Sequence, residues 1–182
     1  GSCEAPQSES MRENPISPYS FSKVAAGHFL QMLHRTEKFP SVILRLFLVY
    51  GPGQDKKRFI PQIIDGCLND LKFDTSNGDQ IRDFCHIDDV VKGILYALKN
   101  MNINGEIINL ASGNPIKLKN IIDHIRNLIG KGLPQYGAVP YRMNENMELY
   151  ADITKAKELL LWKPSIPFED GIKKMIQQHY KG

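Results

Sequence analysis

The sequence of 182 residues is poor in cysteine, close to neutral and without a long apolar run. Its three cysteines, Cys3, Cys67 and Cys85, lack the spacing of metal ligands, so we expect reduced thiols, no bound metal and a cytoplasmic protein. A net charge of +3 from scattered lysines gives no reason to expect a nucleic-acid partner. No apolar stretch approaches the roughly 20 residues of a membrane span, so we expect no membrane partner either.

The sequence also lacks a glycine-rich phosphate-binding turn ahead of its first helix. A dinucleotide-binding fold opens with a strand, such a turn and a helix that holds the pyrophosphate. Residues 1–18 precede the first predicted helix, and they contain no pattern of this kind. The sequence alone therefore provides no pyrophosphate cradle, and a binding fragment without catalysis is one interpretation that stays open.

What is present is an alternation of helical and strand patterns, which is typical of an α/β protein. Residues 41–49 are almost continuously apolar and β-branched, as in a strand buried on both faces of a parallel sheet. Arg45 interrupts this run and would need a partner if buried. Helices are predicted at 19–34, 59–71, 88–98, 118–129, 154–161 and 168–180, and shorter strands at 72–75 and 106–110.

A phenol and an amine four residues apart, Tyr19 and Lys23, stand at the start of the first predicted helix. Ser17 suits the N-cap of this helix, and Pro18 suits its first position. A separation of four residues places both side chains on one helix face, where the ammonium favours the ionised phenol. A phenol of this kind can exchange a proton with a substrate hydroxyl or carbonyl near neutral pH.

Five segments in order carry a family resemblance. They are Ser-Pro-Tyr-Ser-Phe-Ser-Lys (17–23), Leu-Arg-Leu-Phe-Leu-Val-Tyr-Gly-Pro-Gly-Gln (44–54), Asn-Gly-Asp-Gln-Ile-Arg-Asp-Phe-Cys-His-Ile-Asp-Asp-Val (77–90), Ile-Asn-Leu-Ala-Ser-Gly (108–113) and Ala-Asp-Ile-Thr-Lys-Ala-Lys-Glu-Leu-Leu-Leu-Trp-Lys-Pro (151–164). Together they resemble the C-terminal part of the extended short-chain dehydrogenase/reductases, the branch that modifies nucleotide sugars. The resemblance implies an α/β fold: the C-terminal part of a Rossmann-type parallel sheet plus a smaller α/β substrate-binding lobe.

The same resemblance implies how the chain is divided and what it binds. Residues 1–52 would form a partial dinucleotide-binding region with the catalytic helix. Residues 53–182 would form the nucleotide-sugar lobe, with about 83–112 returning to the Rossmann sheet. We expect the chain to be the C-terminal portion of a longer enzyme that uses NAD or NADP, takes a nucleotide sugar as substrate and forms a homodimer through the helix that bears Tyr19.

The resemblance also implies roles for the residues that act on the sugar. Tyr19 would be the general acid and base on the reacting oxygen. Lys23 would assist Tyr19 and hydrogen-bond the nicotinamide ribose, so both residues would also contact the cofactor. Ser2 would hold the reacting oxygen in place if it is a native residue and not part of a tag.

The remaining expected site residues would hold the nucleotide. Arg82 would grip the substrate diphosphate, because a guanidinium makes bidentate, charge-assisted bonds to phosphate; the alternative is a salt bridge to a nearby aspartate. Arg142 and Arg58 would be further phosphate ligands. Phe73 is expected either against the nucleotide base or in the core.

Three reactions share this machinery, and the sequence favours one of them. Dehydratases of the branch follow the catalytic hydroxyl with Asp-Glu, whereas Cys3-Glu4 follows Ser2 here, which disfavours 4,6-dehydration. Epimerases usually place an asparagine where this chain has Leu48, which cannot donate a hydrogen bond. We therefore predict a 4-keto-sugar reductase. The alternatives are a 4-epimerase, a 4,6-dehydratase, which is the less favoured reaction, and a nucleotide-sugar-binding fragment without catalysis. Leu161 also stands where the family commonly has glycine, so the turn there is expected to differ.

Overall fold

The computed structural model describes residues 4–179, and it confirms the α/β class. Its first helix, α1 (Pro18–Glu37), begins as predicted: the Ser17 hydroxyl accepts a hydrogen bond from the Ser20 amide at 3.1 Å, and the Ser20 hydroxyl accepts one from the Ser17 amide at 3.0 Å. These two bonds satisfy amides that a helix start leaves without partners. The cap therefore fixes where α1 starts and where Tyr19 stands.

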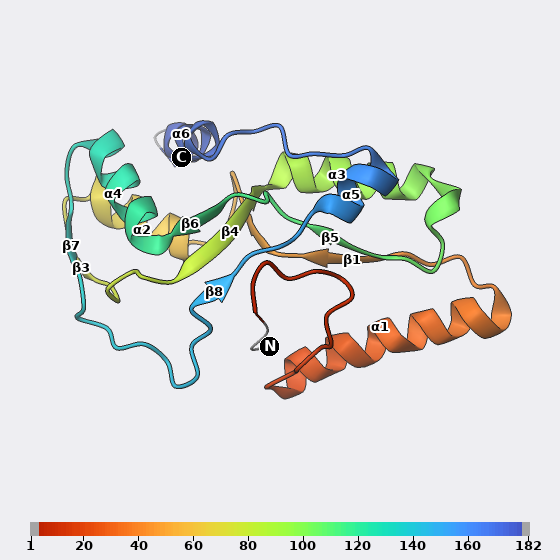
Figure 1. The fold of residues 1–182 in the computed structure, drawn as a ribbon. Coiled ribbons are helices and arrows are strands. Elements are labelled where there is room, and N and C mark those ends of the chain that lie inside the picture. The colour runs from red at the N-terminus through yellow and green to blue at the C-terminus, as the bar shows by residue number, and fades with distance from the viewer. Residues whose placement is uncertain (1–3, 180–182) are drawn as a thin grey trace.

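The predicted long strand is two short strands that pair with different neighbours. Strand β1 (Ile43–Leu46) pairs in parallel with β5 (Ile107–Leu110), while β2 (Leu48–Tyr50) pairs in parallel with β4 (Ile81–His86). The expectation of a strand buried on both faces was wrong: β1 is only half-buried, and Leu46 is 48% exposed. The reason is that α1, which lies on one side of the β1–β5 pair (Figure 1), contributes no buried residue.

Strand β4 pairs with three other strands, of which β2 is one. It also pairs antiparallel with β6 (Pro115–Lys117) and in parallel with the short strand β8 (Glu148–Leu149). Strands β3 (Lys72–Asp74) and β7 (Leu133–Gln135) form a separate parallel pair. The expected division of the chain returns residues 83–112 to the sheet of residues 1–52, and the pairing of β1 with β5 agrees with this. The division itself stays a prediction.

The remaining helices cover these strands. Helix α3 (Ile87–Lys99) and helix α5 (Thr154–Leu160) lie on the side of the β1–β5 pair opposite α1, and α2 (Phe59–Leu68), α4 (Leu118–Ile129) and α6 (Phe168–His179) gather around the β4 end (Figure 1). A short 3₁₀ helix, η1, spans Met101–Ile103. No helix within residues 4–179 has the length and apolar character that a membrane crossing needs.

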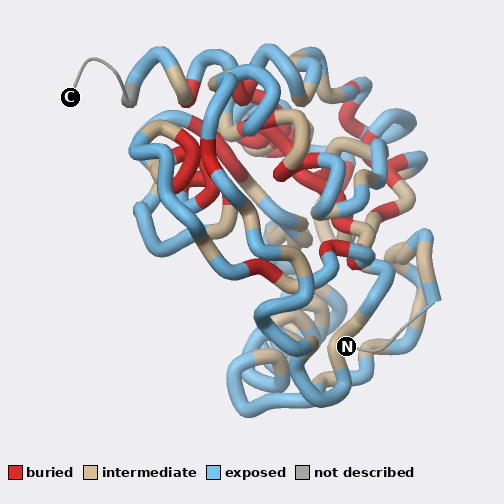
Figure 2. Tube along the Cα trace, turned by 90° about the vertical axis from the view of Figure 1, so that its left-hand side faces the viewer, coloured by how far each residue is buried: buried red, intermediate tan, exposed pale blue. Residues whose placement is uncertain are grey.

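Two apolar cores hold the helices to the strands. One joins α2, α4 and α6 through residues such as Ile64, Ile122 and Ile172, and the other joins α3 and α5 to β5 through Leu110 and Trp162. Buried residues accordingly concentrate in one part of the tube in Figure 2, and the part around the described N-terminal segment is mostly exposed or intermediate. The region that carries Tyr19 is therefore held by caps and polar contacts more than by a core.

Candidate functional site

A single cleft of about 1200 Å³ brings together most of the residues that the sequence singled out. It runs from the start of α1 and the β1–β2 junction, past α2 and β4, to the segments after β3 and β7. Its polar and charged lining residues are Tyr19, Gln54, Asp55, Lys57, Arg58, Gln62, Asp74, Thr75, Ser76, Gln80, Arg82, Tyr141, Arg142 and Glu145. Four residues predicted separately therefore share one cavity: Tyr19, Arg58, Arg82 and Arg142.

Tyr19 and Lys23 are side by side at the cleft end of α1. The Lys23 Nζ lies 5.4 Å from the centroid of the Tyr19 ring, so the ammonium sits over the aromatic face. Tyr19 is 73% exposed and lines the cleft, while Lys23 stands outside the lining. The Tyr19 side chain is thus accessible to a ligand in the cleft.

Arg82 is the one cleft arginine that is buried, and its partner is Glu145. The Arg82 Nη2 donates to the Glu145 Oε1 at 2.6 Å, and its Nη1 donates to the carbonyl oxygens of Ile81 and Met147 at 2.9 and 3.3 Å. Burial lowers the pKa of the guanidinium, and the negative charge of Glu145 opposes that shift. The alternative expected for Arg82 is a salt bridge to a nearby aspartate; the partner found is a glutamate 63 residues away.

Arg58 and Arg142 flank the cleft from two irregular segments. Arg58 is the N-cap residue of α2, where its side chain makes no capping bond, and it is exposed. Arg142 is an exposed residue of the segment that joins β7 to β8. Both guanidinium groups can therefore turn toward an anion in the cleft.

Phe73, expected either against the nucleotide base or in the core, does not line the cleft. Phe73 packs in the core against Gly66 of α2, where an added Cβ would lie 2.6 Å from its ring. Because side chains alternate along a strand, the neighbouring Asp74 lines the cleft in its place. Ser2 lies outside the described residues.

Sequence reasoning missed two buried carboxylates of the 77–90 segment that hold the frame of the site. Asp83 accepts hydrogen bonds from the Ser112 amide and hydroxyl, both at 2.6 Å, and from the Gly113 amide at 2.9 Å. Asp89 accepts from the Ser165 hydroxyl and from the Ser165 and Ile166 amides at 2.8 to 2.9 Å. The available signal was that each acid directly precedes two apolar residues: Phe84 and Cys85 follow Asp83, and Val90 and Val91 follow Asp89.

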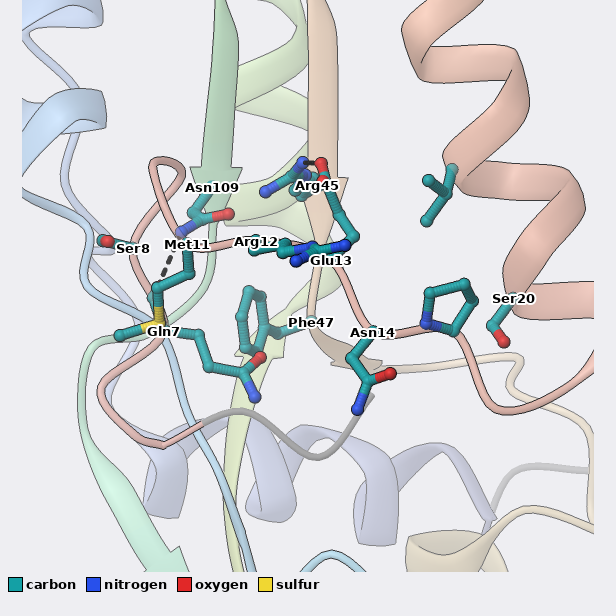
Figure 3. A pocket seen from close by; sticks show the side chains of 12 residues that line it. Gln7, Ser8, Met11, Arg12, Glu13, Asn14, Ser20, Arg45, Phe47 and Asn109 are labelled. Atoms are coloured by element: carbon teal, nitrogen blue, oxygen red, sulfur yellow. Dashed lines mark hydrogen bonds and ion pairs between the residues drawn. The ribbon is translucent and has the colours of Figure 1, made fainter.

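A smaller pocket of about 170 Å³ lies beside the start of α1 and shows how the preceding segment is fastened (Figure 3). Arg45 forms an ion pair with Glu13 and thereby receives the partner that its place in the strand required. The Asn109 side chain donates to the Gln7 carbonyl oxygen at 2.9 Å. These contacts tie residues 7–13 to β1 and β5, and so help to hold the chain leading into Tyr19.

The two described cysteines are buried free thiols. Burial raises the pKa of Cys67 and raises that of Cys85 to about 12, so neither is prepared to react as a thiolate. Within residues 4–179, no group of three or more metal-ligating side chains is gathered.

Comparison with known proteins gives the family context of this cleft. A family model described as GDP-mannose 4,6 dehydratase matches residues 1–175. The chain is 33% identical over 166 residues to a UDP-glucuronate 4-epimerase of Thermodesulfobacterium geofontis, with 90% of this chain and 50% of that protein covered. It is 31% identical over 175 residues to a CDP-abequose synthase of Salmonella typhimurium, with 92% and 56% covered.

A solved structure agrees with these relatives. The structure of the UDP-glucuronic acid 4-epimerase of Bacillus cereus in complex with UDP-glucuronic acid and NAD superposes with a TM-score of 0.89 at 31% identity, over 100% of this chain and 58% of that one. The chain thus spans about half the length of the curated relatives it matches. It belongs to the GDP-mannose 4,6-dehydratase family, among the nucleotide-sugar epimerases and dehydratases of the extended short-chain dehydrogenase/reductases.

Proposed function

We propose that this chain forms the nucleotide-sugar half of an NAD(P)-dependent enzyme that acts at the sugar 4-position. The observation that carries the proposal is the shared cleft: Tyr19, a proton donor and acceptor, lies in one cavity with three arginines from three separate segments. Arginine is suited to phosphate because its planar fork makes bidentate, charge-assisted bonds. A ligand with a diphosphate next to a sugar matches this combination.

The proposed arrangement assigns each end of the ligand to a different part of the cleft. Arg58, Arg82 and Arg142 would hold the diphosphate. Tyr19, at the β1–β2 end, would then face the sugar, and Asp74 at the β3 end would be near the nucleoside. The proposal leaves Phe73 out of base recognition because its ring packs in the core.

The chain's own chemistry in this proposal is proton transfer. Tyr19 would take the proton from a sugar hydroxyl, or return one to a carbonyl oxygen, and the Lys23 ammonium 5.4 Å from its ring would stabilise the phenolate. The Tyr19 and Lys23 side chains would also contact the nicotinamide-ribose end of NAD or NADP, because each of them can hydrogen-bond a ribose hydroxyl. When bound, this cofactor supplies hydride exchange with the sugar carbon.

Of the three net reactions that use this machinery, 4-epimerisation and 4-keto-sugar reduction are each supported by a separate observation. Likeness to two UDP-glucuronate 4-epimerases supports 4-epimerisation. The sequence identity is 33% to one of them and 31% to the other, whose structure is solved. Leu48, an apolar residue lining the cleft where epimerases usually have asparagine, supports the 4-keto-sugar reductase predicted from the sequence. Epimerisation consumes no reduced cofactor in net terms, whereas reduction consumes one per turnover.

The test is turnover of the complete protein with NAD or NADP and UDP- and dTDP-linked sugars. Tyr19→Phe should lower kcat by about 10²-fold to 10⁴-fold, as loss of a positioned acid and base does, with little change in substrate affinity. Tyr96→Phe removes the hydroxyl of a half-exposed tyrosine on α3 and is the matched control. Equal turnover of the Tyr19 variant and the wild type would contradict the assignment.

The same assays separate the two reactions. Appearance of the 4-epimer without loss of reduced cofactor identifies an epimerase. Loss of reduced cofactor in step with product, on a 4-keto sugar substrate, identifies a reductase.

A further inference from the structure

The segment between β7 and β8, residues 136–147, forms one wall of the cleft and has few apolar contacts. It contributes Val139, Pro140, Tyr141, Arg142 and Glu145 to the lining. Of its residues, only Tyr136, at the β7 end, packs against an apolar core. The position of the wall therefore depends on polar contacts.

Two such contacts stand on either side of Arg142. The Tyr141 hydroxyl donates to the Asp79 Oδ2 at 2.8 Å and accepts from the Asp79 amide at 3.4 Å. Glu145 pairs with Arg82 at 2.6 Å, and its amide donates to the Arg142 carbonyl oxygen at 3.0 Å. Arg142 thus occupies a short turn whose two ends are fastened to the strand that carries Arg82 and to the turn before it.

The two contacts differ in how they respond to an anionic ligand. Glu145 and a diphosphate are both negative and both bind the Arg82 guanidinium, so the arriving ligand competes with Glu145 for its donors. The Tyr141–Asp79 bond uses none of the three arginines, so it is not in competition with the ligand. The Val139 amide also donates to the Thr75 carbonyl oxygen at 3.1 Å, and the Met147 carbonyl oxygen accepts from the Ile81 amide at 2.7 Å, so the two ends of the segment are held by backbone bonds. The Tyr141–Asp79 bond is the side-chain contact next to Arg142 that can stay in place when the cleft is filled.

We infer that Tyr141 is a positioning residue: through its bond to Asp79 it holds the 136–147 segment so that Arg142 faces the diphosphate of the ligand. The inference rests on the proposed function, because it assumes a diphosphate in this cleft. Tyr141 acts through Arg142 and is not itself assigned a contact with the reacting atoms. The specificity it confers is for a doubly charged phosphate group placed between Arg82 and Arg142.

The chain offers a chemically matched control in the same segment. The Tyr136 hydroxyl donates to the Asp123 Oδ1 at 2.6 Å, which is again a tyrosine–aspartate bond, but Tyr136 does not line the cleft. A loss of ligand affinity that follows from any weakening of the segment should appear in both Tyr141→Phe and Tyr136→Phe. A loss that follows from the placement of Arg142 should appear only in Tyr141→Phe.

The experiment is a double-mutant cycle on the complete protein with Tyr141→Phe, Asp79→Ala and the double variant. Calorimetric binding of UDP, dTDP, GDP and CDP gives Kd, and turnover gives kcat and KM. For the diphosphate that binds, each single variant should raise Kd by about threefold to tenfold, the range expected for loss of one solvent-exposed hydrogen bond. The double variant should be no weaker than the single ones, because both remove the same bond. KM should rise with kcat unchanged, and Tyr136→Phe should leave Kd at the wild-type value.

The outcomes distinguish this inference from the proposed function. If the wild type binds a nucleoside diphosphate and Tyr141→Phe binds it equally well, or if the two single effects add, the inference fails and the proposed function stands. If Tyr136→Phe weakens binding as much as Tyr141→Phe, the role is one of general stability and the inference fails likewise. If the wild type binds none of the four diphosphates, the proposed function is overturned and the inference falls with it.

Discussion

At the scale of single residues, Leu161 shows how a departure from a family pattern is accommodated. It ends α5 with φ 51° and ψ 31°, the left-handed conformation that glycine adopts at helix ends. The expectation that this turn differs because glycine is absent was wrong. The left-handed turn is kept, with an 85% exposed leucine in the place of glycine.

Leu161→Gly should therefore stabilise the protein by about 0.5–1 kcal/mol. A non-glycine residue in this conformation costs about 1–2 kcal/mol, and the greater freedom of glycine in the unfolded chain removes part of the gain. Urea denaturation of both proteins measures the difference. Leu161→Ala, which removes the exposed side chain but keeps a Cβ, should give no comparable gain; a gain of the same size would attribute the effect to the lost side chain.

Asp89 carries a second prediction at this scale, on acid stability. Burial opposes its negative charge, but the amides of Ser165 and Ile166 and the Ser165 hydroxyl outweigh burial and hold its pKa below the ordinary value of 3.8. A carboxyl group with a lowered pKa in the folded protein stabilises it above the unfolded-state pKa. This stability is therefore complete above about pH 4 and is lost as the pH falls further.

Asp89→Asn should lower the free energy of unfolding at pH 7 by about 1–3 kcal/mol, because it removes a charged acceptor from buried donors. It should also make that free energy less dependent on pH below pH 4. Denaturation at a series of pH values tests both points. Asp88→Asn, at a 58% exposed neighbour, is the control and should leave the acid limb close to that of the wild type; an equal effect of the two variants would contradict the role of Asp89.

At the scale of elements, the fit of α6 over β2 depends on one glycine. A Cβ at Gly171 of α6 would collide with the Tyr50 hydroxyl and lie 2.8 Å from the Cζ of its ring. Tyr50 is buried, and its hydroxyl donates to the Phe168 carbonyl oxygen at 3.3 Å. The helix can approach the strand this closely only because residue 171 has no side chain.

Gly171→Ala should destabilise the protein by about 1–3 kcal/mol through overpacking, even though alanine is the better helix former. The same substitution in a Tyr50→Phe background should cost less, because the hydroxyl that it strikes is gone. Denaturation of the four proteins measures the coupling. A stabilised Gly171→Ala protein would show that helix propensity prevails over packing here.

Helices were predicted better than strands, for a physical reason. A helix shows itself in local spacing and caps: the predicted 118–129 helix is α4, and the predicted start of α1 is fixed by Ser17. A strand is defined by its partner, which the local pattern does not contain. Thus the predicted strand 41–49 divides at Phe47, because its first half pairs with β5 and its second half pairs with β4. For the same reason, strands β4, β6, β7 and β8 were not predicted.

At the scale of the whole molecule, several residues of the site could be predicted, but the long-range contacts that hold them in place could not. Tyr19, Arg58, Arg82 and Arg142 follow from residue chemistry and the family resemblance, and they share the cleft. What could not be predicted is the long-range pairing, such as that of Arg82 with Glu145, because a sequence does not say which distant segment will lie opposite. The assignment of roles to these residues stays a prediction.

The apolar face of α1 gives the last prediction, on assembly. Gly27 faces β1, where an added Cβ would lie 4.0 Å from the Ile43 Cδ1. Phe21 and Phe29, eight residues apart, are 62% and 57% exposed in this chain. Residues four and eight apart share a helix face, so the two rings form one apolar stripe with Ala25 between them. Such a stripe fits the homodimer through this helix that the family resemblance implies.

Phe29→Lys in the complete protein should therefore convert a dimer to a monomer, because it places a charge in the centre of a helix–helix contact. Sedimentation equilibrium measures the mass of each form, and the helix content by circular dichroism should stay unchanged. Leu98→Lys, at a 70% exposed position of α3, is the control that adds the same charge to another apolar surface. A wild type that sediments as a monomer, or a Phe29→Lys protein that stays dimeric, would show that α1 does not form the dimer contact.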